Sequence, residues 1–207
     1  LAQDSSSSLY ALFDVEGNET KILGNLNAHG KVALFNQNGV IFGNNSRVDV
    51  GSIIVSTGSV DHDDLIDGDG RFEFTGFGEG EIVNDGVITV ADAGIAAFVA
   101  PHIANRGEIY ARMGKVALAA GEKVTLDLYG DNLVEIAVSD ELADGLISNT
   151  GTISAEGGAV IVKAHIAKNA VENVINMDGV VNVSSATVQG GKILSLIHIS
   201  EPTRHES

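Results

Sequence analysis

The chain contains no cysteine and no tryptophan, and only two of its 207 residues are proline. The absence of cysteine excludes disulfide scaffolds, thiol nucleophiles and zinc–thiolate sites at once. Aromatic residues make up only 5% of the chain, so the apolar residues available for a core are mostly Val, Ile, Leu and Ala. We therefore expect a core of small aliphatic side chains, many of them β-branched.

Basic residues and long apolar segments are also scarce. Lys and Arg total 12 against 28 Asp and Glu, which gives a formal charge of −16. A field of that sign repels phosphate backbones and anionic lipids, so it disfavours nucleic-acid binding and electrostatic membrane attachment. No apolar run reaches the length of about 18 residues that a membrane-spanning helix needs. The opening residues, "LAQDSSSSLY", have neither a start Met nor the basic and apolar regions of a signal peptide, so we expect a piece of a longer protein.

Glycine and aliphatic residues are abundant. Hydrophobic residues make up 44% of the chain, which is enough for one sizeable packed domain. Twenty-five glycines indicate many short strands separated by tight turns.

An internal repeat is the strongest signal in the chain. Its units read "EIVNDGVITVADAGIAAFVA", "HIANRGEIYARMGKVALAA", "LISNTGTISAEGGAVIVKA" and "NVINMDGVVNVSSATVQGGKIL". The recurring Asn lies at positions 84, 105, 149 and 176, with separations of 21, 44 and 27, so the basic period is about 21 to 22 residues. The separation of 44 is best explained by an insertion into one turn.

Short strands in a repeat of this length, joined by Asn-x-Gly bends, predict an all-β fold, a right-handed parallel β-helix. Each coil pairs its strands with the coils above and below, and the inward aliphatic side chains form one column. The recurring Asn needs no chemical role, because it suits corners and can bond the backbone or the Asn of the next coil. About eight coils, a rod of about 40 Å, would fit residues 20–194 at this period.

Several segments are assigned by their local patterns. The runs "KVALFN", "RVDVGSIIVST" and "RFEFTGFG" carry the strand pattern forward over residues 31–78, and residues 123–138 predict a hairpin outside the stack, with its turn at Tyr129–Asn132. Helical spacing predicts a short helix within Ala164–Met177. We expect a poorly structured start at 1–9, the β-helical domain at 10–194 and a non-repeat tail at 195–207, which is a candidate for a non-native segment.

The sequence offers little support for catalysis or metal binding. The acidic run Asp61–Gly70 fails the EF-hand template, the six histidines form no metal-binding cluster, and no Gly-x-Ser-x-Gly elbow is present. A β-helical polysaccharide lyase or glycosidase is the enzymatic alternative. Its candidate carboxylates are Asp49, Glu73, Asp127 and Glu135.

The stretch "NQNGVIFG", Asn36–Gly43, is first of all a bend between two strands, because Asn38 and Gly39 tolerate positive φ. At the corner of a β-coil, either Val40 and Phe42 or else Ile41 would point into the column.

This stretch and its surroundings, "KILGNLNAHGKVALFNQNGVIFGNNSRVDVGSIIVST", resemble the haemagglutination-activity, or two-partner secretion, domain of large bacterial exoproteins of the filamentous-haemagglutinin type. That family carries the motif Asn-Pro-Asn-Gly-Ile/Val-Ile/Leu-Phe-Gly, and here Gln37 replaces the proline. The segments "GKVALAAGEKVTLDLYGDNLVEIAV" and "SNTGTISAEGGAV" extend the resemblance over roughly residues 10–194. The upstream part of the family domain is missing, so the resemblance implies an N-terminally truncated domain.

The resemblance implies a non-enzymatic module without a cofactor that directs secretion and serves as an adhesin scaffold. Its expected partner is an outer-membrane β-barrel transporter with periplasmic recognition domains, which exports the protein through the periplasm to the exterior or the cell surface. The expected transporter-recognition motif consists of Asn36, Gln37, Asn38, Gly39, Val40, Ile41 and Phe42. We expect a monomer, with a host-cell receptor or glycan as a second partner. Adhesin, haemolysin and contact-dependent toxin passengers all remain open, as do a glycan-binding module and the lyase.

Overall fold

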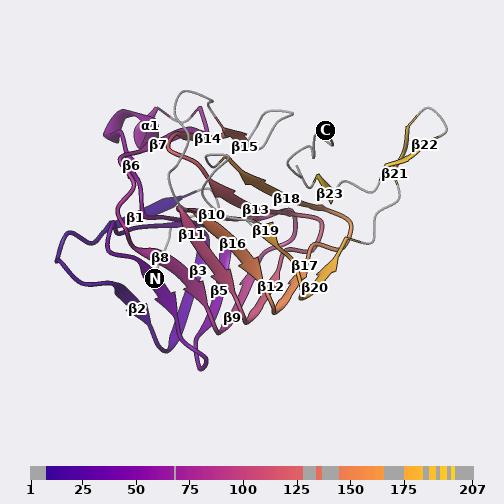
Figure 1. The fold of residues 1–207 in the computed structure, drawn as a ribbon, viewed down its shortest axis with the longest axis horizontal. Helices are drawn as coiled ribbons and strands as arrows, with labels where there is room; N and C mark the ends of the chain where they lie inside the picture. The colour runs from indigo at the N-terminus through magenta and orange to yellow at the C-terminus, as the bar shows by residue number, and fades with distance from the viewer. Residues whose placement is uncertain are drawn as a thin grey trace, which may run out of the picture.

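The computed structural model describes residues 8–67, 69–127, 134–136, 145–165, 175–183, 187–189, 192–194 and 197–198. Strands dominate this part of the chain, and consecutive strands wind around a common interior (Figure 1).

The strands form three faces of a solenoid, and every pairing within these faces is parallel. The first face consists of β2 (Thr20–Ile22), β4 (Val40–Phe42), β8 (Glu81–Asn84), β11 (His102–Asn105), β16 (Leu146–Asn149) and β19 (Ile175–Asn176). The second consists of the first halves of β3 (Asn25–Phe35) and β5 (Arg47–Ser56), with β9 (Val87–Val90), β12 (Glu108–Tyr110), β17 (Thr152–Ser154) and β20 (Val180–Asn182). The third consists of the second halves of β3 and β5, with β1 (Leu9–Phe13), β10 (Ile95–Val99), β13 (Lys115–Ala120), β18 (Ala159–Ala164) and β23 (Ile197–His198).

The predicted parallel β-helix is therefore confirmed, but its expected length is wrong. The described residues form six stacked coils, counted as the six strands of the first face, instead of about eight. Two stretches leave the stack: residues 57–80 between β5 and β8, and the described residues 121–127 and 134–136 between β13 and β16. Since these described residues add no coil, the six coils extend over about 29 Å at the usual strand spacing.

The interior column is aliphatic and in register from coil to coil. Ile82, Ile103 and Ile147 lie opposite one another on the first face, and Ile88, Ile109 and Ile153 do so on the second. All six side chains are buried in one cluster. β-Branched side chains suit this position because they pack well on pleated, fully covered strands.

A second core lies outside the column, over the third face. It is covered by a four-stranded antiparallel sheet, sheet C, made of β6 (Ser59–Val60), β7 (Arg71–Thr75), β14 (Val124–Asp127) and β15 (Val134–Ile136), with the short helix α1 (His62–Ile66) beside it. Phe72, Phe74 and Leu126 pack there against the outward side chains of the third face. This sheet explains why the third face is buried on both sides.

Sheet C confirms one local prediction and corrects another. The hairpin predicted at 123–138 exists as the antiparallel pair β14–β15 outside the stack, while its predicted turn at Tyr129–Asn132 lies outside the described residues. The run "RFEFTGFG" does not continue the solenoid, because its alternating Phe residues face the outer core. Alternation alone cannot tell which of two apolar surfaces a strand covers.

The predicted helix within Ala164–Met177 falls mostly outside the described residues. Of the described ones, Ala164 ends β18 and Ile175–Asn176 form β19. The short pair β21 (Thr187–Gln189) and β22 (Lys192–Leu194) is antiparallel.

The recurring Asn forms a buried ladder at the corner between the first and second faces. Asn84 Nδ2 donates to Asn105 Oδ1 at 2.7 Å, and Asn105 Nδ2 donates to Asn149 Oδ1 at 2.6 Å. The Gly of each Asn-x-Gly unit lies two residues after the ladder Asn. Glycine is required there because a Cβ at Gly107 would overlap the carbonyl oxygen of Gly86 in the coil before. The ladder thus explains the Asn of the Asn-x-Gly bend, and the close contact between backbones explains its Gly.

Asn176, the fourth Asn of the repeat, does not extend this ladder. Asn176 pairs with Ser148, so Met177 takes the ladder position and packs against the interior column. Asn149, which is fully buried, consequently has no partner for its Nδ2 among the described residues. The sequence pattern allowed one or two residues between Asn and Gly, and this tolerance hid the one-residue shift.

Replacing Asn105 by Ala should destabilise the chain far more than replacing Asn176. Asn105→Ala removes two buried ladder bonds. Asn149 Oδ1 then loses its donor and Asn84 Nδ2 keeps only the Glu108 carbonyl, so the free energy of unfolding should fall by about 2–4 kcal/mol. Chemical denaturation of both variants measures this. Asn176→Ala is the matched control, with an expected loss below about 0.5 kcal/mol, and equal losses would contradict the register described here.

Candidate functional site

The predicted motif lies at the corner between the third and first faces, where β3 ends and β4 begins. Asn36–Gly39 form a turn in which the Gly39 amide donates to the Asn36 carbonyl at 3.0 Å. The side chain of Asn36 closes a second ring of the same size, an Asx turn, because its Oδ1 accepts the Asn38 amide at 2.8 Å. Only Gly39 has positive φ, at 111°, so Asn38 does not use the left-handed conformation that its residue type tolerates.

Asn36 anchors this turn from below. The side chain is only 2% exposed, and its Nδ2 donates to the Asn18 carbonyl at 2.8 Å and to Thr20 Oγ1 at 2.9 Å. Thr20 Oγ1 donates in turn to Asp14 Oδ2 at 2.6 Å. A chain of hydrogen bonds therefore links the Asp14 carboxylate to the turn.

These hydrogen bonds shift the pKa of Asp14. The Thr20 hydroxyl, and after it the Glu16 amide, stabilise the ionised carboxylate and lower the pKa of Asp14 below its ordinary value of 3.8. The charged form of Asp14 is thus the one that supports the turn.

The following coil packs tightly against the other side of the turn. The Gly80 amide donates to the Gln37 carbonyl at 3.2 Å, and the Thr20 amide donates to the Gly39 carbonyl at 2.9 Å. A Cβ on Gly39 would lie 2.7 Å from the Glu81 carbonyl oxygen, so only glycine fits. The turn is sandwiched between the coils before and after it.

The structure divides the seven predicted recognition residues into two groups. Val40 and Phe42 point into the column and are fully buried, which selects the first of the two orientations considered from the sequence, and Asn36 and Gly39 are buried as well. Gln37 and Asn38 are exposed, and Ile41 is half-buried. Folding therefore hides most of the motif.

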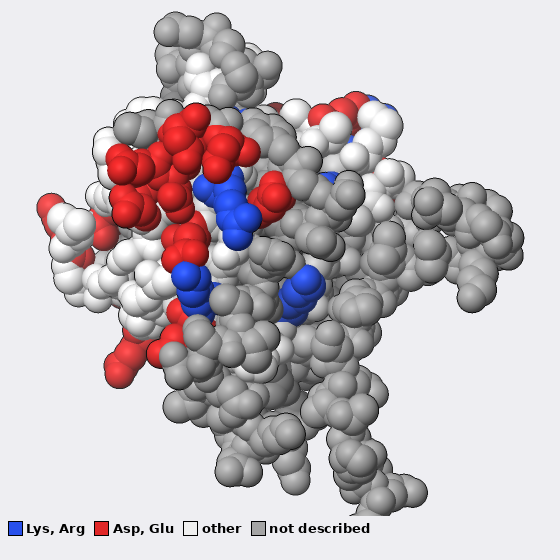
Figure 2. All heavy atoms as spheres, turned by 90° about the horizontal axis from the view of Figure 1, so that it is seen from above, with Lys and Arg blue, Asp and Glu red and all other residues white. Residues whose placement is uncertain are grey.

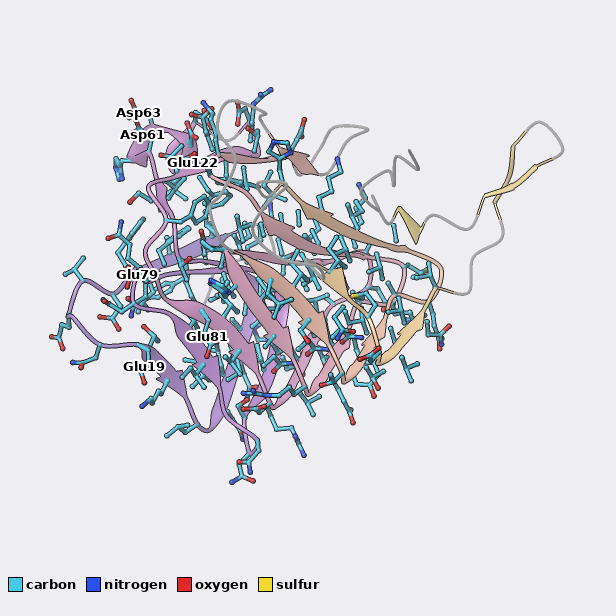
Figure 3. All side chains as sticks on the ribbon, viewed as in Figure 1. Glu19, Asp61, Asp63, Glu79, Glu81 and Glu122 are labelled. Atoms are coloured by element: carbon cyan, nitrogen blue, oxygen red, sulfur yellow. The ribbon has the colours of Figure 1, made fainter. Side chains whose placement is uncertain are left out.

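Acidic side chains surround the exposed part of the motif. Figure 3 shows Glu19, Glu79 and Glu81 on the side of the molecule where β2 and β8 lie, and all three are exposed. Glu19 pairs with Lys21 at 2.9 Å, and this contact lowers the pKa of the Glu19 carboxyl.

A larger acidic group lies over sheet C. Figure 2, seen from above Figure 1, shows Asp and Glu side chains gathered on this face, where α1 and β7 lie. The carboxylates of the Asp61–Gly70 run serve the local backbone: Asp61 caps α1 by accepting the Asp63 amide, and Asp64 accepts the Glu73 amide at 2.9 Å. Within the part of the chain that the structure describes, no three His, Cys, Asp or Glu residues are arranged to hold a metal ion.

The four carboxylates considered for a lyase do not form one group. Asp49 lies on the second face of the solenoid, whereas Glu73, Asp127 and Glu135 belong to sheet C. Glu73 is paired with Lys123 at 2.5 Å, and in the strand register Thr125 stands between Glu73 and Glu135.

Sequence reasoning missed the residues that support the turn. Asp14, Asn18 and Thr20 come from the coil before, and Gly78 and Gly80 come from the segment that returns from the excursion to β8. The density of glycine in "GFGEG", residues 76–80, was a signal of a close backbone approach. Among the described residues, no helix is both long and apolar enough to cross a membrane.

Comparison with known proteins is consistent with this architecture and with the resemblance predicted from the sequence. A family model described as the TPS secretion domain, where TPS stands for two-partner secretion, matches residues 11–201. The crystal structure of the HMW1 secretion domain from Haemophilus influenzae superposes with a TM-score of 0.69 and 27% sequence identity, covering 78% of this chain and 43% of that one.

Two curated relatives are similar in sequence. A heme/hemopexin-binding protein of Haemophilus influenzae strain ATCC 51907 / DSM 11121 / KW20 / Rd is 31% identical over 145 residues, which cover 67% of this chain and 16% of the relative. A second heme/hemopexin-binding protein of Haemophilus influenzae is 26% identical over 202 residues, or 87% of this chain and 21% of the relative. This chain thus spans about a fifth or less of the length of the curated relatives it matches.

Replacing Asn36 by Ala should loosen the turn and lower stability. Asn36→Ala removes the bonds to Asn18 and Thr20 and frees the Asn38 amide, so we expect a loss of about 1–3 kcal/mol in unfolding free energy. Thermal and urea denaturation measure it. The matched control is Asn44→Ala, at an exposed position just after β4, and a loss in the control as large as in Asn36→Ala would count against the anchoring role.

The link from Asp14 to the turn predicts a response to acid. Since the folded-state pKa of Asp14 is lowered, its contribution is present above the ordinary pKa and is lost as pH falls through the folded value, in the window below 3.8. An NMR titration should show the Asn36 side-chain amide shifting together with the Asp14 carboxyl. Thr20→Val should raise the pKa of Asp14 towards its ordinary value, and the control Thr89→Val should leave it unchanged. An Asn36 amide resonance that does not follow the titration of the Asp14 carboxyl would refute the link.

Proposed function

The chain belongs to the TPS secretion domain family. We propose that it carries the secretion signal of a large bacterial exoprotein and that the transporter binds this signal while the chain is unfolded. Domains of this family direct the two-partner secretion of exoproteins across the outer membrane, with an outer-membrane transporter as the partner. The proposed partner for this chain is a β-barrel transporter with periplasmic recognition domains. The recognition motif consists of Asn36, Gln37, Asn38, Gly39, Val40, Ile41 and Phe42.

The observation that carries this proposal is the burial of the motif in the folded coil. β4 pairs with β2 on one side and with β8 on the other, so its backbone has no free edge. Val40 and Phe42 are at the same time fully buried. A partner that reads these side chains, or that adds a strand to this backbone, must therefore meet the segment before the coil closes.

The same geometry supports a separation between reading and folding. In the periplasm the extended segment offers backbone groups and alternating side chains to a strand edge of the transporter. After export, the coils can stack one on another, since each strand pairs with the coil before it. Closure of the next coil, which contains β8, over β4 then removes the motif from the transporter and favours forward export.

The proposed module is monomeric and non-enzymatic, and it acts as a scaffold at the cell surface or in the medium. The dispersed positions of Asp49 and of the sheet C carboxylates support this reading over a lyase. A receptor- or glycan-binding role is a second candidate, favoured by the hairpin β14–β15, which stands outside the stack. Binding of the purified domain to a glycan panel would distinguish a binding module from an export module alone.

Substitutions on the exposed side of the motif should block export without unfolding the domain. The full-length exoprotein that carries this domain is co-expressed with its transporter, and the double variant Asn38→Ala, Ile41→Ala should accumulate in the periplasm. Asn38 is exposed and Ile41 is half-buried, so the melting temperature of the purified domain should change by only a few degrees, about 2–4 °C.

The control for this experiment is Asn44→Ala with Asn45→Ala, which alters two exposed residues directly after the motif. These control variants should be secreted normally. Normal secretion of the Asn38, Ile41 variant would overturn the assignment of the motif, and periplasmic accumulation of the control would show that the assay reports on stability instead.

A further inference from the structure

Gln37 makes two long-range hydrogen bonds although it lies on the exposed side of the motif turn. Its Nε2 donates to Ser59 Oγ at 3.0 Å and to the Gly76 carbonyl at 3.1 Å. These partners are 22 and 39 residues further along the chain. A single side-chain amide thus joins the turn to two distant segments.

The two partners mark the beginning and the end of one excursion from the solenoid. Ser59 opens β6, and Gly76 directly follows β7, whose Thr75 pairs with Ser59 in the antiparallel register. Residues 59–76 therefore form a closed excursion that includes α1 and half of sheet C. Gln37 bridges its base.

The chain returning from the excursion is also fitted to the turn. A Cβ on Gly78 or Gly80 would overlap the backbone of Gln37 or Asn38, and the Gly80 amide donates to the Gln37 carbonyl. Backbone contact and side-chain bonds thus converge on the same residue. The turn and the base of the excursion form one unit through Gln37.

The amide of Gln37, unlike its carbonyl and its side chain, makes no hydrogen bond among the described residues. Gln37 is the second residue of the four-residue turn and has negative φ. Proline is favoured at the second position of such turns, because its ring fixes φ and it has no amide hydrogen to pair. Here the side chain supplies the restraint that a proline ring would give.

We propose that Gln37 is a positioning residue that couples the order of the motif turn to the closure of the 59–76 excursion. The turn reaches its folded geometry when Ser59 and Gly76 come together and accept the two hydrogen bonds of Gln37. The same two bonds hold the two ends of the excursion together. Coupling of this kind is reciprocal, so weakening it must loosen both sides. Its consequence for export, that the excursion withdraws the turn from the transporter, rests on the proposed function, whereas the coupling itself does not.

Amide hydrogen exchange on the 207-residue chain tests the coupling without any transporter. Gln37→Met keeps the side-chain length but removes the donor, and it should speed the exchange of the Gly39 and Gly80 amides about fivefold, as expected for the loss of a neutral hydrogen bond. The Gly78 amide, which donates to the Thr57 carbonyl at the base of the excursion, should become faster by a similar factor. An effect that is merely local to the turn would leave the Gly78 amide unchanged.

Gln37→Pro separates the two sides of the coupling. The ring restores the turn, so the Gly39 amide should exchange as slowly as in the parent chain, while the Gly78 amide should remain fast because proline cannot reach Ser59 or Gly76. Ser59→Ala should act on the same amides as Gln37→Met, and the two should not add in the double variant, since both break the same bond.

Unchanged exchange at Gly78 in Gln37→Met, or additive effects of Gln37→Met and Ser59→Ala, would overturn the inference. Failure of the export proposal gives a different result: the exchange pattern would follow the expectation while the Asn38, Ile41 variant is still secreted.

Discussion

Parallel backbone pairing between successive coils is the interaction on which the whole structure depends. A single coil buries almost nothing, but each strand of coils 2 to 5 on the first face has a neighbour above and below, and this brings isoleucines of equivalent position into one column. The constraint also fixes the corners. Backbones that stack at strand spacing leave no room for side chains at Gly107, and they place the amides of Asn84, Asn105 and Asn149 within reach of one another.

Strand pairing within the stack conflicts with access of a partner to the motif Asn36–Phe42. Stacking uses both edges of β4 and buries Val40 and Phe42, so the fold hides most of the segment that we propose as the export signal. A secretion domain gains from this arrangement, because recognition and folding then exclude one another in time. Only Gln37, Asn38 and part of Ile41 stay at the surface, beside acidic residues.

Much of the fold could be predicted from the chain because a repeat encodes its own neighbours. The 21-residue step from Asn84 to Asn105 identifies partners directly, and alternation identifies which side chains point inward. Prediction failed where a second surface competed for the same pattern. Phe72 and Phe74 alternate as column residues would, yet they cover the outside of the third face. Asn176 failed for a related reason, since Ile175 and Met177 fill the column equally well in its place.

The sequence by itself determined the β-helix, its aliphatic column, its Asn-x-Gly corners and the position of the motif turn, because all of these depend on local pattern and period. Only the tertiary structure decided what holds the turn. Its supports, Asp14, Asn18 and Thr20 before it and Ser59 and Gly76 after it, share no pattern with Asn36 or Gln37 and meet them only when coils are stacked. Contacts between residues that the chain keeps far apart are set by which surfaces pack together, and a single sequence does not display that choice.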